Sequence, residues 1–138
     1  MKATVKWLDG ATFVGESGSG HCLVLDGPPE HGGRDVGIRP METMLVGIGA
    51  CTAFDVVAIL KKAREPFVDC RVELEAERAE SPPKVFTRVQ LRFVVTGKGL
   101  RRSAVERAVK LSAEKYCSAT AMLRPTVDIR HEVEIVEA

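Results

Sequence analysis

The sequence predicts one α+β domain, because alternating strands surround two helical segments. Residues 1–26 contain three short runs of the kind found in an antiparallel meander. Residues 40–64 form a long apolar segment with helix signals at both ends, and residues 68–95 contain two further alternating runs. A chain of 138 residues is one domain by length and can bury a stable core without disulfides. We therefore expect a single domain, residues 1–138, with helices packed on a mainly antiparallel sheet.

The first 26 residues predict the meander. The run "ATVKWL" is followed by Asp9-Gly10, a dipeptide favoured in tight hairpin turns. The run "ATFVGE", the turn "SGSG" and the run "HCLVLDG" complete three strands. Residues 27–37 contain four glycines and two prolines, which predicts a loop.

A long helix is expected from Pro40 to about Arg64. Proline is tolerated in a first helical turn, Glu42 suits the positive end of the helix dipole, and Pro66 stops the helix. The middle of the segment is apolar on nearly every face, so we expect this helix to be central and buried.

The next two runs predict a β-hairpin. Residues 68–77 alternate, with Val68 and Cys70 expected on the buried face and acidic residues on the outer face. The run "VFTRVQLRFVV" places Arg88 and Arg92 on its outer face. Acidic and basic outer faces on paired strands would attract each other across the hairpin.

A second helix and a last strand complete the pattern. Ser103 and Glu106 match a capping box, which marks the start of a helix. Cys117 then lies at the C-terminal end of this helix, a short segment "SATAML" follows, and "TVDIRHEVEIV" alternates as a closing strand.

Composition excludes several functions. The net charge of +1 gives no basic surface for nucleic acid or an anionic membrane, and aromatic residues make up only 5%. The apolar stretch 44–60 is interrupted and is predicted to fall short of a membrane span of about 20 residues. We find no signal-peptide pattern, and we expect a cytoplasmic protein. Four cysteines without C-x-x-C spacing, and three histidines without a ligand spacing to any cysteine, predict no metal or cofactor.

The four cysteines differ in setting. Cys22 is expected to be half-buried in a strand, and Cys70 to pack in the core. Cys51 lies in the apolar helix, where a thiol normally has a raised pKa, and the helix dipole does not favour a thiolate at Cys117. Spacing does not decide whether these two sulfurs meet. From the residues alone, packed thiols and a redox pair both remain open.

Three segments resemble a known family. They are "PMETMLVGIGACTAFDVVAILKK", "PKVFTRVQLRF" and "VERAVKLSAEKYCSATAML". In order and spacing they resemble the OsmC/Ohr proteins (osmotically induced and organic hydroperoxide resistance proteins), and in particular the OsmC-like subgroup, over almost the whole chain. The resemblance implies an intertwined α+β homodimer with one cysteine on a central helix and another after the second helix.

The resemblance also implies a reaction. Cys51 would attack an organic hydroperoxide and become a sulfenic acid, and Cys117 would condense with it to a disulfide. A dithiol would reduce that disulfide, as a lipoyl group does in one branch of the family. An arginine, here Arg34 or Arg39, would stabilise the thiolate, and Glu42 would hold that arginine.

Two positions depart from the peroxidases of the family. Many of them have the arginine-holding glutamate ten positions before the first cysteine, where this chain has Met41; Glu42 is rotated by about 100° around the helix. Asp55 shares a helix face with Cys51, and an uncompensated carboxylate there would raise the thiol pKa unless it paired with a cation. Both departures favour the alternative, a non-catalytic dimeric protein that binds a small molecule.

Overall fold

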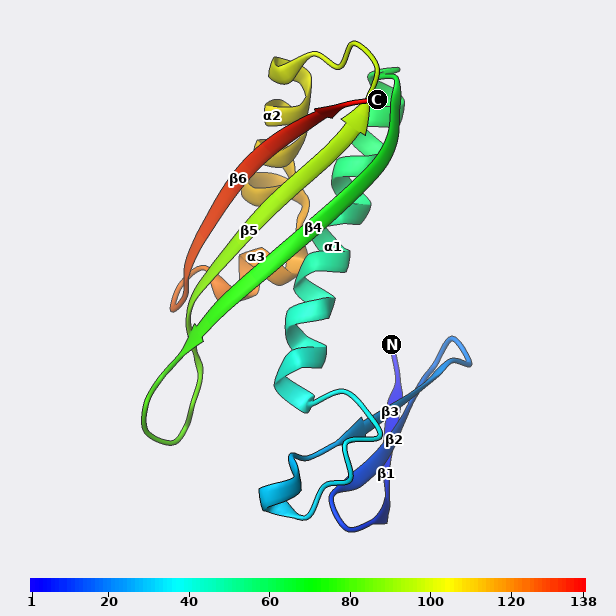
Figure 1. The fold of residues 1–138 in the computed structure, drawn as a ribbon, viewed down its shortest axis with the longest axis vertical. Helices are drawn as coiled ribbons and strands as arrows, with labels where there is room; N and C mark the ends of the chain where they lie inside the picture. The colour runs from blue at the N-terminus through cyan, green and yellow to red at the C-terminus, as the bar shows by residue number, and fades with distance from the viewer. The chain divides into compact units, whose positions relative to one another are not determined.

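The computed structural model describes all residues, 1–138, and divides them into two compact units. The first unit is Met1–Met44 and the second is Leu45–Ala138. Figure 1 shows the predicted order of elements: three strands, a long helix, a β-hairpin, a second helix and a last strand. Each unit is described below by itself.

The N-terminal unit is the predicted meander. Its strands pair antiparallel in the order β1-β2-β3, and a 3₁₀ turn, η1, follows them. The bounds are β1 Ala3–Asp9, β2 Thr12–Ser17, β3 Cys22–Asp26 and η1 Pro29–His31. Gly10 has a φ of 54°, which L side chains rarely adopt, so glycine serves the hairpin turn that its sequence predicted.

The loop after β3 is organised by one buried carboxylate. Asp26 accepts hydrogen bonds from the backbone N–H groups of Gly27 (2.9 Å), Arg34 (2.9 Å) and Val36 (3.2 Å), and from the Thr12 hydroxyl (3.2 Å). Burial by itself raises the pKa of Asp26, but these bonds outweigh burial and lower it below its ordinary value. The glycine-rich segment is therefore tied to the sheet.

Helix α1 spans Pro40–Lys62, as the sequence predicted, but one chain covers only one side of it. Its buried side chains recur every fourth residue, at Ile48, Thr52, Val56 and Leu60. Phe54, on another face, is 77% exposed. The expectation of a helix buried on all sides is therefore wrong for a single chain. By length and composition alone α1 could also cross a membrane, although core helices of water-soluble proteins pass the same test.

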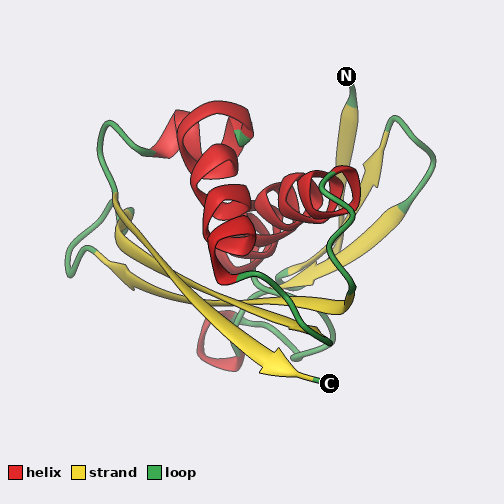
Figure 2. Ribbon diagram, turned by 90° about the horizontal axis from the view of Figure 1, so that it is seen from above, coloured by secondary structure: helices red, strands yellow, loops and turns green.

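The C-terminal unit contains a mixed sheet of order β4-β5-β6. Strand β5 pairs antiparallel with β4 and parallel with β6, which is the one parallel pair in the mainly antiparallel fold that the sequence predicted. The bounds are β4 Phe67–Arg78, β5 Phe86–Gly97 and β6 Asp128–Glu137. Figure 2 shows the two long helices, α1 and α2, over one face of this sheet. The core includes Leu91 and Phe93 of the central strand, both fully buried.

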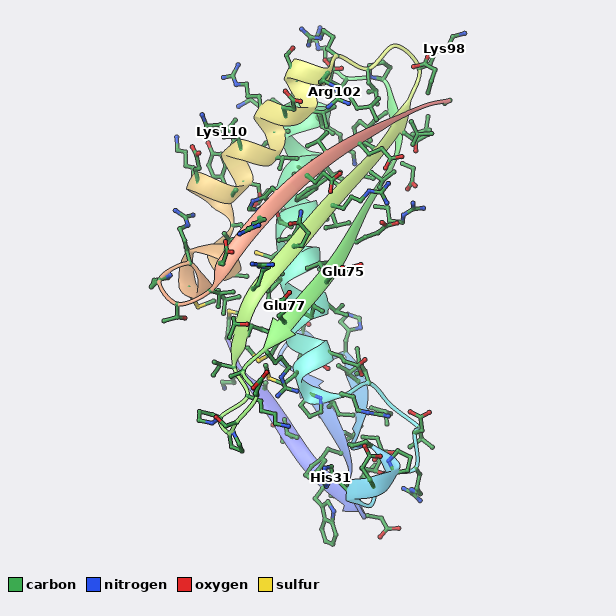
Figure 3. The ribbon with its side chains drawn as sticks, turned by 60° about the vertical axis from the view of Figure 1, so that its left-hand side comes forward. His31, Glu75, Glu77, Lys98, Arg102 and Lys110 are labelled. Carbon is green, nitrogen blue, oxygen red and sulfur yellow. The ribbon has the colours of Figure 1, made fainter.

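The outer face of the hairpin carries the predicted charge pairs. Arg92 bonds Glu73 at 2.9 Å, and Arg88 lies 3.5 Å from Glu77, which is labelled on β4 in Figure 3. Val68, expected inside, is 73% exposed. The register shifts at the start of β4, and this bulge turns Val68 out of the alternation.

Three helical segments connect β5 to β6. They are α2 Arg102–Leu111, the π-helical turn η2 Ser112–Tyr116 and α3 Ser118–Leu123. The predicted capping box is wrong: Arg101 is the N-cap residue, and Glu106 pairs with Arg102 at 3.1 Å. The buried carboxylate of Glu65 instead accepts the backbone N–H of Arg101 at 3.1 Å and its Nε at 2.7 Å. The start of α2 is thus fixed by a residue of the segment between α1 and β4.

We expect Glu65→Gln to weaken folding near neutral pH by about 1–2 kcal/mol, because it removes a charge-assisted hydrogen bond. The Arg101 N–H and guanidinium hold the pKa of Glu65 below its ordinary value. The pair therefore stabilises the fold above about pH 4.3, and this contribution is lost as pH falls through the lower folded pKa. Urea denaturation at pH 7 and pH 3 measures it. An equal gap between wild type and variant at both pH values would contradict this assignment.

Candidate active site

The structure brings Cys51 and Cys117 together. Cys51 is half-buried on α1, and Cys117 is buried with 2% of its surface exposed. Burial is the main cause that raises the pKa of the Cys117 thiol, and the neighbouring Cys51 raises it further. The two side chains are therefore neighbours in space, although 66 positions separate them along the chain.

The Cys117 sulfur has two hydrogen-bond donors. The Thr120 backbone N–H lies 3.4 Å from Sγ and the Thr120 hydroxyl 3.2 Å from it. Cys117 follows η2, as expected for the end of the second helical segment, but it is also the N-cap of α3. The two Thr120 donors lower the pKa of Cys117 and partly offset its burial, so this sulfur is better prepared to carry negative charge than its helix-end position predicted.

Ser112 connects the two cysteine-bearing segments. Its hydroxyl lies 2.8 Å from the Thr52 hydroxyl and 3.0 Å from the Asp55 carboxylate. A carboxylate only accepts, so Ser112 donates its single proton to Asp55 and accepts from Thr52. The Ser112 carbonyl accepts the Cys117 N–H at 2.8 Å, the bond that closes the π-helical turn. One residue therefore fixes the turn before Cys117 and also holds α1 at the position next to Cys51. Such π turns occur frequently at functional sites.

Asp55 differs from both expectations. It forms no ion pair with an arginine or lysine of the chain; its carboxylate accepts from Ser112. The carboxylate of Asp55, which lies near Cys51, thus accepts a hydrogen bond from a hydroxyl group and is not paired with a cation.

We expect Ser112→Ala to slow closure of a Cys51–Cys117 disulfide by at least about tenfold and to destabilise the unit by about 1–3 kcal/mol, because Asp55 and Thr52 lose a buried partner. Disulfide closure is measured by quenched-flow alkylation with a thiol oxidant such as diamide. Ser103→Ala, an exposed serine on α2, is the matched control. Closure at the wild-type rate in Ser112→Ala would show that Ser112 does not position the thiols.

Arg34 is tied into the N-terminal unit. Its backbone N–H donates to Asp26, and its guanidinium donates to the Thr12 hydroxyl at 3.1 Å and lies 3.8 Å from Asp9. Arg34 lies in the predicted loop, and its backbone and side chain are both engaged in hydrogen bonds. The side chain is still 56% exposed.

Arg39 and Glu42 lie at the start of α1. The Arg39 guanidinium pairs with Asp35 at 2.9 Å, and its side chain is 28% exposed. The Glu42 carboxylate accepts the Arg39 backbone N–H at 2.9 Å and so caps the helix. Glu42 was expected to hold an arginine guanidinium, but in this structure it holds an arginine backbone.

The other two cysteines stand apart. Cys22 is exposed rather than half-buried. Cys70 is half-buried on the inner face of β4, and burial, followed by the nearby Asp69, raises its pKa. A raised pKa makes Cys70 a poor nucleophile at neutral pH.

Sequence patterns missed Ser112, Thr52 and Thr120 as site residues. Each is a small polar residue within a helical pattern, and all three are almost fully buried. Their hydrogen-bond partners near the cysteines become apparent only when the helical segments pack together in the structure.

The fold and the two thiols define a class of protein: an α+β chain whose long helix and second helical segment each present a cysteine to the other. Comparison with known proteins supports this class. The sequence profile described as "OsmC-like protein" matches residues 31–132. Protein YhfA of Escherichia coli K12 is 50% identical over 138 residues, covering 100% of both chains. The chain belongs to the OsmC-like family.

Solved structures agree with this assignment. A hypothetical protein from Aquifex aeolicus is 32% identical, with a TM-score of 0.87, covering 99% of this chain and 96% of that one. The organic hydroperoxide resistance protein OhrB of Bacillus subtilis is 20% identical, with a TM-score of 0.65 and 96% coverage of each chain. At that identity the likeness to OhrB concerns the fold alone.

Proposed function

We propose that the protein is a thiol peroxidase that reduces organic hydroperoxides by a two-cysteine mechanism. The observation that carries this proposal is that Cys51 is close enough to Cys117 to raise the pKa of its thiol. Two thiols that meet from distant parts of the chain are what disulfide chemistry requires. A relative of the same fold, OhrB, is described as an organic hydroperoxide resistance protein.

The first step uses Cys51. Its thiolate attacks the outer oxygen of the hydroperoxide, the O–O bond breaks, and the products are a sulfenic acid on Cys51 and an alcohol. The second step uses Cys117, whose sulfur attacks the Cys51 sulfenic sulfur to form a disulfide and water. A dithiol then reduces the disulfide by exchange; a lipoyl group has the required chemistry. The Thr120 donors would stabilise negative charge on Cys117 as it attacks.

A cation near Cys51 would favour its thiolate and assist the leaving oxygen. We propose Arg34 or Arg39 for this role, with Glu42 as a positioning residue. Arg39 has the more shielded side chain, at 28% exposed against 56% for Arg34. Substituting each arginine by glutamine separates the two candidates: loss of the first step in only one variant names the residue.

We also propose that the protein is a homodimer. Phe54 is 77% exposed on α1, and a hollow of about 450 Å³ beside it is lined by alanines, Val57 and Lys61. Exposed apolar surface of this kind marks an interaction site, and a second copy of α1 has the matching chemistry.

A second function, a non-catalytic dimeric protein that binds a small molecule, is favoured by two observations. Burial raises the pKa of Cys117, and Asp55 places a carboxylate one turn from Cys51. The raised pKa disfavours a thiolate at Cys117, and a carboxylate is not the cationic neighbour that a reactive cysteine at position 51 would need.

A thiol count tests the two functions against each other. One equivalent of cumene hydroperoxide is added to the reduced protein, and free thiols are then titrated in denaturant. The peroxidase loses two of its four thiols, whereas a non-catalytic binding protein retains all four. Retention of four thiols would overturn the proposed peroxidase.

A further inference from the structure

A hollow with a basic rim lies between the C-terminal half of α1 and α2. Its volume is about 580 Å³. Lys62 of α1 and Arg101 and Arg107 of the α2 segment contribute the positive charges, and Ile59 and Leu111 contribute apolar surface. We call this hollow the basic groove. Apolar surface beside a few convergent polar groups is typical of a small-molecule site.

Two of the three positive charges of the basic groove are not balanced by the chain. Arg101 is paired with the buried carboxylate of Glu65. Lys62 and Arg107 form no ion pair with any carboxylate of the protein within 4.0 Å. Two uncompensated cations beside an apolar surface raise the local concentration of anions and provide donors for a carboxylate or phosphate.

The basic groove continues toward the two cysteines. A second hollow of about 250 Å³ shares Ile59, Lys62 and Tyr116 with it and reaches Asp55. Tyr116 is the residue before Cys117, and Asp55 lies one helical turn from Cys51. A ligand anchored at Lys62 would therefore extend along α1 toward the paired thiols.

We propose that the basic groove binds a small amphipathic anion. Its carboxylate or phosphate group pairs with Lys62 and Arg107, and its apolar chain lies along Ile59 and Leu111 toward Tyr116. Binding does not require any reaction. Only the further role, in which the anionic end orients a substrate toward Cys51, rests on the proposed peroxidase function.

Binding is tested on a Cys51→Ser/Cys117→Ser protein, which cannot react. Calorimetric titrations use decanoate, decyl phosphate, decanol and inorganic phosphate, all below micelle-forming concentrations. We expect decanoate or decyl phosphate to bind at least about tenfold more tightly than decanol or phosphate, and the preference identifies the headgroup. The ring signals of Tyr116, the only tyrosine, should shift in the NMR spectrum. The proposed site would be overturned if decanol bound as tightly as decanoate, or if the ring signals of Tyr116 did not shift.

Paired variants locate the charge. Lys62→Gln/Arg107→Gln should weaken binding of the preferred anion by at least about tenfold and reduce its salt dependence. Lys84→Gln/Lys110→Gln removes the same charge elsewhere and should leave affinity unchanged; Figure 3 shows Lys110 on α2. Circular dichroism and sedimentation of each variant check fold and oligomeric state. Equal affinity of the two double variants for the anion would overturn the proposal. So would a change of oligomeric state in the variants if the basic groove of the wild type bound no anion.

Discussion

The Cys51→Ser variant should lose hydroperoxide reduction by at least about a thousandfold, because a serine hydroxyl is not a nucleophile toward peroxide oxygen at neutral pH. No disulfide should form in this variant after one equivalent of cumene hydroperoxide. Cys117→Ser should behave differently. It retains the first step but not the second, so a Cys51 sulfenic acid should accumulate and react with dimedone, which mass spectrometry detects at one site per chain.

The remaining cysteines provide the controls. Cys22→Ser and Cys70→Ser should reduce hydroperoxide at the wild-type rate, since Cys22 is exposed in the other unit and burial raises the pKa of Cys70. If Cys51→Ser still consumed hydroperoxide as fast as wild type, the assignment of Cys51 as the attacking thiol would be wrong. If Cys117→Ser closed a disulfide, another cysteine would be the resolving partner.

The Phe54→Glu variant should dissociate the proposed homodimer. A two-fold symmetric interface would contain Phe54 twice, so the change removes two aromatic anchors and brings two like charges together. A loss of about 2 kcal/mol at each copy weakens association by roughly a thousandfold. Sedimentation equilibrium across a dilution series measures it, with dimer mass expected for wild type and monomer mass for the variant.

Phe54 is 77% exposed in the single chain, so its replacement leaves the chain's own core intact. Lys110→Glu places the same new charge on an exposed position of α2 and should remain dimeric. A monomeric wild type would remove the dimer from the proposal, and a dimeric Phe54→Glu would move the interface to another face.

Local signals predicted most of the fold. The Asp9-Gly10 turn, the start of α1 at Pro40 and the charge pairs of the hairpin were each specified by residues close in sequence or by strand alternation. Where prediction failed, a longer-range contact decided. Glu65, from the segment after α1, holds Arg101, the N-cap residue of α2, and a bulge turns Val68 outward.

The candidate site was predicted less completely. The family resemblance named Cys51 and Cys117, yet neither spacing nor composition contains the information that they meet. That information lies in the packing of η2 on α1 through Ser112. The role of Thr120 could not be predicted either, because a threonine in a short helix has no distinguishing sequence pattern. Only the structure places its hydroxyl beside the Cys117 sulfur.

The buried carboxylate of Asp26 determines where this chain tolerates a change in length. One oxygen, Oδ2, accepts both the Arg34 and the Val36 N–H, so the backbone between them has a fixed span. The 3₁₀ turn Pro29–His31 precedes this span and contains no buried residue. Inserted residues or a fused peptide tag should be accommodated there, whereas a single residue added at position 35 would pull one of the two N–H groups away from Asp26. Comparing the stability of such insertion variants would distinguish the part of the loop that tolerates a change in length from the part that is held to the sheet by Asp26.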